Sequence, residues 1–204
     1  MRPILILGAS GFIGYTLYKE LARYFNTYGT YNCSKNYVNN KLYIPYNHKK
    51  DNLKQILNDL NPKLIISSMR GEFNSQIEAH IHIKNYVKSN NCRIMFISSA
   101  NVFDSFRHFP SYEYDKTLSE SIYGHFKIKI ENLILQLPVG KFNIIRLPMI
   151  FGFNSPRTWE LDHAVNNNKT IEVFPNTIIN VNSDISTKPC HAILLWSSVN
   201  QTDA

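Results

Sequence analysis

A glycine-rich turn directly behind the first apolar run of the chain constrains its fold more than any other feature. The run Ile4–Leu7 is followed by Gly8, Gly11 and Gly14 at a spacing of Gly-x-x-Gly-x-x-Gly. Glycine allows a strand to turn tightly, and it allows the following helix to pack closely on that strand. The N-terminus of such a helix offers free N–H groups and a partial positive charge to a phosphate. The spacing therefore predicts a strand–turn–helix unit that binds the diphosphate of a nucleotide, in preference to a merely structural turn.

Apolar runs and segments of helical periodicity alternate along most of the chain. We predict strands at residues 4–7, 28–33, 41–44, 64–67, 94–98 and 142–147. We predict helices at residues 12–24, 53–60, 77–87 and 120–137. This alternation predicts an α/β fold with a Rossmann-type doubly wound parallel sheet, which binds ligands at the carboxyl ends of its strands. After residue 151 the pattern weakens, and we predict a surface loop at 165–170, a short strand at 178–181 and a terminal helix at 185–196.

The charge and the cysteines exclude several other classes of protein. The net charge is +7, but the basic residues are scattered and no Arg-rich stretch alternates with aromatic residues, so we expect no nucleic-acid partner. The three cysteines, Cys33, Cys92 and Cys190, fit neither a metal site nor a paired disulfide framework. No apolar stretch approaches the roughly 18 residues of a membrane span. We therefore expect a cytoplasmic protein without a bound metal.

The end of the second predicted strand bears on the choice of cofactor. It carries Asn32, Cys33, Ser34 and Lys35, with no acidic residue among them. A carboxylate at this point would bind the ribose 2′-hydroxyl of NAD and repel a 2′-phosphate. We therefore predict NADP, with NADPH preferred and NAD as the alternative, and we expect Ser34 and Lys35 to hold the 2′-phosphate. The alternative for Lys35 is a solvated surface lysine.

A tyrosine and a lysine on the fourth predicted helix supply the chemistry of proton transfer. Tyr123 and Lys127 are four residues apart and so share one face of that helix. A free tyrosine has a pKa near 10, and we expect the Lys127 ammonium to lower it. Tyr123 would then exchange a proton with a substrate oxygen while hydride moves to or from a nicotinamide. Ser99, just past the fifth predicted strand, would polarise that oxygen, whereas the alternative for the pair is a tyrosine at the edge of the core beside a snorkelling lysine.

The predicted site residues come from several separate segments of the chain. The predicted catalytic residues are Ser99, Tyr123 and Lys127. The predicted cofactor contacts are Gly8, Ser10, Gly11, Phe12, Ile13, Gly14, Ser34, Lys35, Ser67 and Lys127, the last of these at the nicotinamide ribose.

The order of these features resembles the extended short-chain dehydrogenase/reductase family. The glycine turn, the serine, the Tyr-x-x-x-Lys helix with Glu131, and the segment 145–152 follow one another as in that family. Within it, Val102-Phe103-Asp104 is most similar to the dTDP-4-dehydrorhamnose reductase group. The resemblance implies an NAD(P)-dependent oxidoreductase that reduces a nucleotide-linked 4-keto-6-deoxy sugar at C4. It also implies a role in surface polysaccharide or O-antigen biosynthesis and a homodimer formed through the Tyr123 helix.

Departures from the family pattern leave other functions open. Ala100-Asn101 follows Ser99 where sugar dehydratases carry an Asp-Glu pair, so dehydration is not expected, while Ser-Ser-Ala is nearer to sugar epimerases. Gln76 stands where the family has a structural asparagine. The resemblance implies a dinucleotide-binding domain at 1–152 and a reduced C-terminal substrate lobe, a short segment at 153–204 packed on that domain. The alternatives are a nucleotide-sugar epimerase with bound NAD and a non-catalytic, dinucleotide-binding regulatory subunit.

Overall fold

The computed structural model describes residues 2–106, 111–148, 150, 152 and 155–170, and it contains one six-stranded sheet within these residues. The strands are β1 (Ile4–Leu7), β2 (Thr27–Tyr31), β3 (Tyr43–Pro45), β4 (Leu64–Ser67), β5 (Arg93–Ser99) and β6 (Phe142–Leu147). The helices are α1 (Phe12–Leu21), α2 (Leu53–Leu60), α3 (Phe73–Ser89), α4 (Ile122–Ile134) and α5 (Pro156–Asn166), with 3-10 turns η1 (Lys35–Tyr37) and η2 (Ala100–Phe103). The chain divides into two compact units, Met1–Arg146 and Leu147–Ala204.

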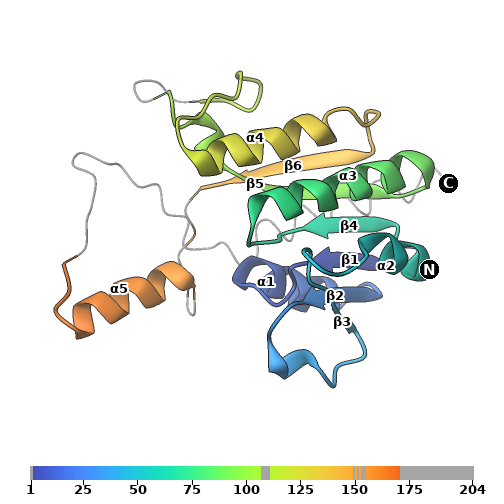
Figure 1. The fold of residues 1–204 in the computed structure, drawn as a ribbon, viewed down its shortest axis with the longest axis horizontal. Coiled ribbons are helices and arrows are strands. Elements are labelled where there is room, and N and C mark those ends of the chain that lie inside the picture. Colours follow the sequence, from blue (N-terminus) through green and yellow to red (C-terminus); the bar gives the residue numbers. More distant parts are fainter. Residues whose placement is uncertain (1, 107–110, 149, 151, 153–154, 171–204) are drawn as a thin grey trace. The chain divides into compact units, whose positions relative to one another are not determined.

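The strand order of the sheet creates a point at which ligands bind in folds of this kind. The order is β3-β2-β1-β4-β5-β6, so the sheet grows in one direction from β1 to β3 and in the other from β4 to β6 (Figure 1). The pairs β1–β2 and β1–β4 are both parallel, with Ile6 opposite Gly29 and Leu7 opposite Ser67. Connections that leave β1 and β4 toward opposite sides open a crevice at their carboxyl ends.

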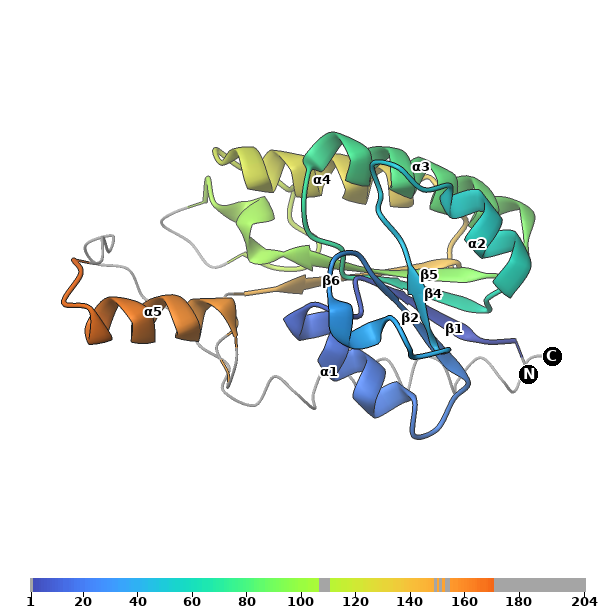
Figure 2. The same ribbon diagram turned by 60° about the horizontal axis from the view of Figure 1, so that its bottom comes forward.

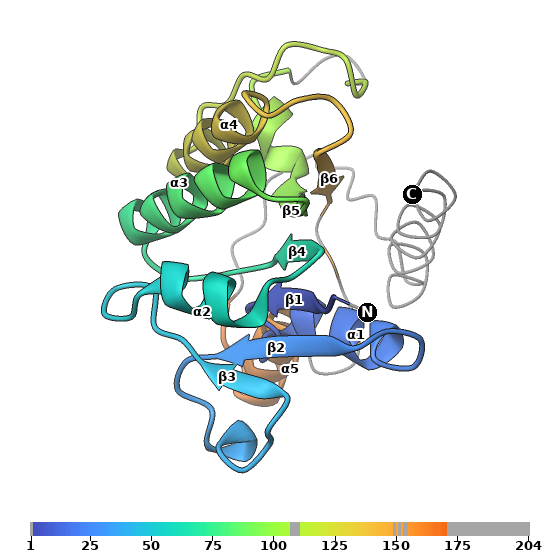
Figure 3. The ribbon, with the colours of Figure 1, turned by 90° about the vertical axis from the view of Figure 1, so that its right-hand side faces the viewer.

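Helices cover both faces of the sheet. Figures 2 and 3 show α2, α3 and α4 together on one face and α1 on the other. The largest apolar cluster lies between the sheet and the three-helix face. Its members include Leu5 and Leu7 of β1, Ile65 of β4, Phe96 of β5, Leu57 of α2, Ile83 and Val87 of α3, and Phe126, Ile130 and Ile134 of α4. Because β1 and β4 are buried on both faces, each is a continuous apolar run up to its final residue.

The observed elements confirm the predicted fold class and most of the predicted elements. The bounds of β1, α2, β4 and β6 are those predicted from the sequence, and α2 ends at Asn61, whose φ of 47° is left-handed. Helix α3 begins at Phe73, four residues before the predicted start at residue 77, because the Glu72 carboxylate accepts from the backbone N–H groups of Asn74 and Ser75. Glutamate is not a common residue at this capping position, so the earlier start is not evident from the sequence.

Beyond β6 the sequence reading missed one helix. Helix α5 was not predicted, and its last residues overlap the loop predicted at 165–170. Its start is specified locally, because the Ser155 hydroxyl accepts from the backbone N–H of Thr158 and Pro156 occupies the first helical position. The strand predicted at 178–181 and the helix predicted at 185–196 lie outside the described residues. Within the described part of the chain, no helix combines the length and the apolar character needed to cross a membrane.

Candidate functional site

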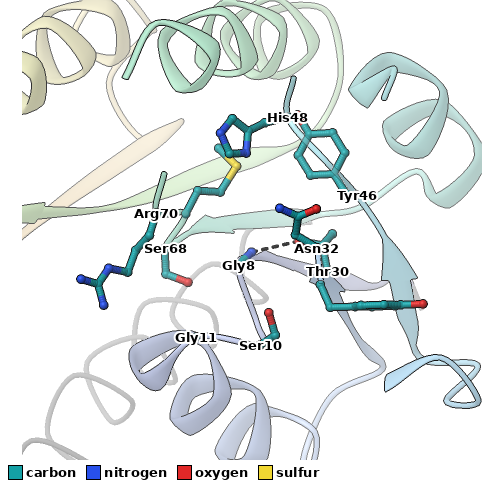
Figure 4. Close-up of a pocket in the computed structure, with 11 residues that line it drawn as sticks. Gly8, Ser10, Gly11, Thr30, Asn32, Tyr46, His48, Ser68 and Arg70 are labelled. Carbon is teal, nitrogen blue, oxygen red and sulfur yellow. Dashed lines mark hydrogen bonds between the residues drawn. The ribbon is translucent and has the colours of Figure 1, made fainter. Parts of the chain in front are cut away.

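A pocket opens where β1, β2 and β4 end, within the unit Met1–Arg146 (Figure 4). Its lining comes from the glycine turn, from the segments after β2 and β3, and from the loop after β4. The lining residues are Gly8, Ser10, Gly11, Thr30, Tyr31, Asn32, Tyr46, His48, Ser68, Met69 and Arg70. The pocket therefore lies at the crevice that the strand order predicts.

The glycine turn has the close approaches that only glycine allows. Gly8 has a φ of 82°, and a Cβ atom there would lie 2.8 Å from the carbonyl oxygen of Ser68. A Cβ atom at Gly14 would lie 2.2 Å from the carbonyl oxygen of Gly8. Helix α1 begins after Gly11 without a side-chain cap, so the N–H groups of its first turn have no side-chain acceptor. Such N–H groups bind anionic oxygens, above all those of phosphate.

The predicted contacts of the glycine turn fall into two groups. Gly8, Ser10 and Gly11 line the pocket. Phe12 and Ile13 belong to the first turn of α1 directly behind it, and neither is among the lining residues. Gly14 is buried in the same helix, where its lack of a side chain lets α1 pack against the turn.

The two predicted 2′-phosphate contacts do not line the pocket. Ser34 is half-buried at the N-terminus of η1, and Lys35 is exposed in the first position of that turn. The segment instead contributes Thr30, Tyr31 and Asn32 to the lining, and Thr30 Oγ1 accepts a hydrogen bond of 2.9 Å from the backbone N–H of Gly8. The described residues thus place Asn32, rather than Ser34 or Lys35, at the pocket itself.

Ser67 ends β4 and Ser68 follows it, and of these two serines only Ser68 lines the pocket. The Ser67 hydroxyl is buried and hydrogen-bonded to Nε2 of His80 at 2.9 Å. Burial lowers the pKa of His80 to about 4, so His80 is neutral at physiological pH. Ser68 Oγ donates to the carbonyl oxygen of Leu7 at 3.0 Å from the pocket side. Successive side chains of a strand alternate between faces, which accounts for this difference of one residue.

Tyr46, His48, Met69 and Arg70 complete the lining, and sequence reasoning did not single them out. Burial raises the pKa of Tyr46 to about 12, so its hydroxyl stays protonated. Burial also lowers the pKa of His48, and its Nε2 atom is buried without a hydrogen-bond partner among the described residues. The signal that would have found them is position, since Met69 and Arg70 follow β4 at the switch point and Tyr46 and His48 follow the edge strand β3.

The predicted catalytic residues come from the end of β5 and the start of α4. Ser99 is the last residue of β5, and its hydroxyl donates to Oδ1 of Asn101 at 2.8 Å. Tyr123 lies in the first turn of α4 and is 42% exposed, whereas Lys127 is 5% exposed. Gly124 brings α4 close to η2, because a Cβ atom there would lie 2.5 Å from the carbonyl oxygen of Asn101. One half-exposed phenol and one buried ammonium thus lie on the same helix face beside the end of β5.

The ammonium of Lys127 is held by main chain and by aromatic rings. Its Nζ donates to the carbonyl oxygen of Ile97 at 3.0 Å and lies 4.7 Å from the ring centre of Phe96. It lies 5.6 Å from the ring centre of Tyr123. Lys127 therefore contacts β5 and the tyrosine ring at once.

The pKa values of the pair differ from the sequence-based expectation. Burial raises the pKa of Tyr123, and the charge of Arg70 opposes that increase. The expected lowering by Lys127 is therefore not found. Burial lowers the pKa of Lys127 itself to about 8, Arg70 adds to the lowering, and Glu131 opposes it. At neutral pH the pair consists of a protonated phenol and a largely protonated amine.

A buried carboxylate links α4 to the neighbouring strands. Glu131 of α4 is 1% exposed, accepts a hydrogen bond from the Ser98 hydroxyl, and forms an ion pair of 2.8 Å with Arg146 of β6. Arg146 also donates to the carbonyl oxygen of Glu113 at 2.8 Å. This network fixes β5, α4 and β6 relative to one another beside Ser99 and Lys127.

Comparisons with known proteins agree with this architecture. The family described as the RmlD substrate binding domain matches residues 1–175. No curated protein sequence matches the chain. A hypothetical dTDP-4-dehydrorhamnose reductase from Sulfolobus tokodaii has a similar solved structure, 23% identical with a TM-score of 0.78, covering 98% of this chain and 73% of its own.

Two further solved structures with similar folds carry other names. The Bordetella bronchiseptica enzyme WbmG, solved with NAD and UDP, is 14% identical with a TM-score of 0.75, covering 96% of this chain and 68% of its own. UDP-N-acetylglucosamine 4-epimerase from Methanobrevibacter ruminantium M1, solved with UDP-N-acetylmuramic acid, is 18% identical with a TM-score of 0.72. That comparison covers 97% of this chain and 73% of the epimerase. At these identities the likeness shows the fold alone.

Proposed function

Because the chain belongs to the RmlD substrate binding domain family, we propose that it reduces the keto group of a nucleotide-linked 4-keto-6-deoxy sugar with NAD(P)H. One observation carries the proposal: a single sheet presents both a glycine-turn pocket and a catalytic set. The pocket lies at the ends of β1, β2 and β4, and Ser99, Tyr123 and Lys127 lie at the end of β5 and on α4. A dinucleotide-binding subunit without catalysis does not require the second group.

The proposed roles of Ser99, Tyr123 and Lys127 follow from their protonation and their hydrogen bonds. A bound nicotinamide supplies the hydride in enzymes of this kind. Tyr123 is partly exposed and has a raised pKa, so at neutral pH it carries the proton that the reduced oxygen requires. Ser99 orients that oxygen through its hydroxyl. Lys127 has three N–H bonds, one of which is directed to Ile97, and the others are available to the cofactor ribose.

The residues that line the pocket are compatible with a dinucleotide whose adenosine ribose does or does not carry a 2′-phosphate. The uncapped N-terminus of α1 would hold the diphosphate, against the pocket wall formed by Gly8, Ser10 and Gly11. No carboxylate is among the described lining residues, so nothing in the lining repels a 2′-phosphate. We propose NADPH as the preferred cofactor, with Asn32 at the adenosine ribose and with Ser34 and Lys35 just beyond it.

The substrate class is supported by the family and by the solved reductase with a similar fold. The solved epimerase, together with the Ser-Ser-Ala segment at the end of β5, favours a second candidate, a nucleotide-sugar epimerase that keeps NAD bound. We propose that residues 153–204 serve the substrate side. A role in surface polysaccharide biosynthesis, a cytoplasmic location and a homodimer through α4 stay predictions.

Net consumption of NADPH separates the two candidate functions. Purified protein is incubated with NADPH and dTDP-4-dehydrorhamnose, and the nicotinamide absorbance and the sugar products are followed together. A reductase consumes one NADPH for each keto sugar that is reduced. Conversion between two sugar nucleotides without consumption of NADPH, by protein that retains NAD through gel filtration, would support the epimerase and contradict the reductase.

A further inference from the structure

Arg70 is the one residue with a permanent charge among the eleven residues that line the pocket. The other lining groups are backbone, hydroxyls, the Asn32 amide, the Met69 thioether and His48, whose pKa is lowered by burial. A guanidinium stays charged throughout the physiological pH range. The charge that this pocket presents to a ligand is therefore that of Arg70 together with the N-terminus of α1.

The charge of Arg70 is not neutralised within the described part of the chain. No ion pair or hydrogen bond from its guanidinium is found there, and the side chain is exposed. The nearest acid in the sequence, Glu72, is engaged elsewhere, because its carboxylate accepts from the backbone of Asn74 and Ser75 and from the Ser75 hydroxyl. Arg70 is therefore free to bind an anion.

Arg70 lies at one end of the pocket. Figure 4 shows its side chain directed away from His48 and Asn32, on the side where Ser68 lies. Its charge also reaches the catalytic pair, since it contributes to the pKa values of both Tyr123 and Lys127. Arg70 thus lines the side of the pocket that lies away from Asn32.

We propose that Arg70 binds the diphosphate of the dinucleotide through the phosphate nearer the nicotinamide ribose. The N–H groups of the first turn of α1 would hold the diphosphate from the other side. The planar fork of an arginine matches two phosphate oxygens and binds them more strongly than a neutral donor does. This inference rests on the proposed function, because it requires that the pocket take a nicotinamide dinucleotide. It assigns Arg70, which the sequence patterns did not indicate, as a residue that positions the nicotinamide half.

Two ligands separate this role from a general effect of charge. NADPH contains both phosphates of the diphosphate, whereas adenosine 2′,5′-bisphosphate lacks the phosphate on the nicotinamide side. We expect Arg70→Gln to weaken NADPH binding by about tenfold to hundredfold, which is typical for the loss of a charged hydrogen bond. The affinity for adenosine 2′,5′-bisphosphate should change less than about twofold by the same reasoning, and Arg70→Lys should fall between Arg70→Gln and the wild type.

The matched control is Arg23→Gln. It removes the same charge from an exposed ion pair with Glu20 at the end of α1, outside the pocket, and should alter neither affinity.

Equal weakening of the binding of both ligands in Arg70→Gln would overturn the assignment to the nicotinamide-side phosphate. Wild-type binding of NADPH with no loss in Arg70→Gln would overturn the role of Arg70 and leave the proposed function standing. If the wild type binds neither NADPH nor NADH, both proposals are wrong. If it binds NADH alone, the same comparison is made with NADH and AMP.

Discussion

The charged form of Lys127 is disfavoured by the burial of its side chain. The side chain is 5% exposed, and its ammonium is compensated by the carbonyl oxygen of Ile97, by the ring of Phe96 and by the field of Glu131. Burial outweighs these contributions and lowers the pKa of Lys127 to about 8. A lysine kept this close to neutrality is a common feature of catalytic sites, where it is retained for chemistry and not for stability.

The buried charge of Lys127 should make the free energy of unfolding depend on pH. The pKa of Lys127 is about 8 in the folded protein and 10.5 in its ordinary state. Between these values the unfolded chain binds more protons, so the free energy of unfolding rises with pH. We expect the wild type to gain roughly 1 to 3 kcal/mol relative to Lys127→Met over this range. Urea unfolding at a series of pH values measures the gain.

Lys129→Met is the control for this series, because Lys129 lies on the same helix and is exposed. Its free energy of unfolding should follow that of the wild type at every pH. Identical pH dependence in Lys127→Met and the wild type would show that Lys127 is not held near neutrality in the folded protein.

At the scale of elements, the turn between β1 and α1 depends on the space that its glycines leave. A methyl group at Gly14 would lie 2.2 Å from the carbonyl oxygen of Gly8 and 2.7 Å from Oγ of Ser68. Both contacts are shorter than atoms allow, and one of them involves backbone that cannot move without displacing the turn. A methyl group at Gly11 would meet only the carbonyl oxygen of Gly8, at 3.3 Å.

These distances predict different outcomes for two otherwise similar substitutions. Gly14→Ala should lower the free energy of unfolding by about 1 to 3 kcal/mol, as overpacking of a tight site does, and should abolish NADPH binding. Gly11→Ala should cost less than about 1 kcal/mol in stability and weaken NADPH binding on its own, because Gly11 lines the pocket. Thermal unfolding and fluorescence titration measure the two effects. Equal stability of both variants and the wild type would contradict the packing described for this turn.

The elements that could be predicted from the sequence are those whose signals are local. Strand β1 and the first three residues of β4 are buried and are continuous apolar runs, and α2 ends at the Asn61-Pro62 pair. The starts of α3 and α5 were not predicted, because the first depends on a glutamate cap and the second lies in a segment with little apolar periodicity. The bounds of an element can therefore be predicted from the sequence only when the residues that begin and end it are common capping or stop residues.

The site divides in the same way. The glycine turn and the pair of Tyr123 and Lys127 could be predicted, because each is a short pattern with a physical reason for its spacing. The walls formed by Asn32, His48 and Arg70 could not be predicted, because they follow different strands and meet only once the strand order is known. Ser67 was predicted as a cofactor contact, but Ser68 lines the pocket instead. Successive side chains of a strand point to opposite faces, so an error of one residue selects the wrong side chain.

At the scale of the whole molecule, one sheet serves two tasks. Its centre, at β1 and β4, carries the pocket that we propose for a dinucleotide, and its side at β5 and α4 carries the proposed proton donor. The Glu131–Arg146 ion pair joins this second region to β6. The family match confirms the predicted membership among extended short-chain dehydrogenase/reductase enzymes, and the structure confirms the doubly wound parallel sheet.

The central claim is that Tyr123 donates the proton that completes reduction of the keto sugar. The most direct test measures single-turnover oxidation of NADPH by dTDP-4-dehydrorhamnose in wild-type protein, in Tyr123→Phe and in Tyr114→Phe. Tyr114 is 99% exposed, so its substitution controls for the loss of a tyrosine hydroxyl elsewhere. We expect Tyr123→Phe to fold and to bind NADPH as the wild type does but to react about 10²- to 10⁴-fold more slowly, while Tyr114→Phe reacts normally. Reaction of Tyr123→Phe at the wild-type rate would contradict the account.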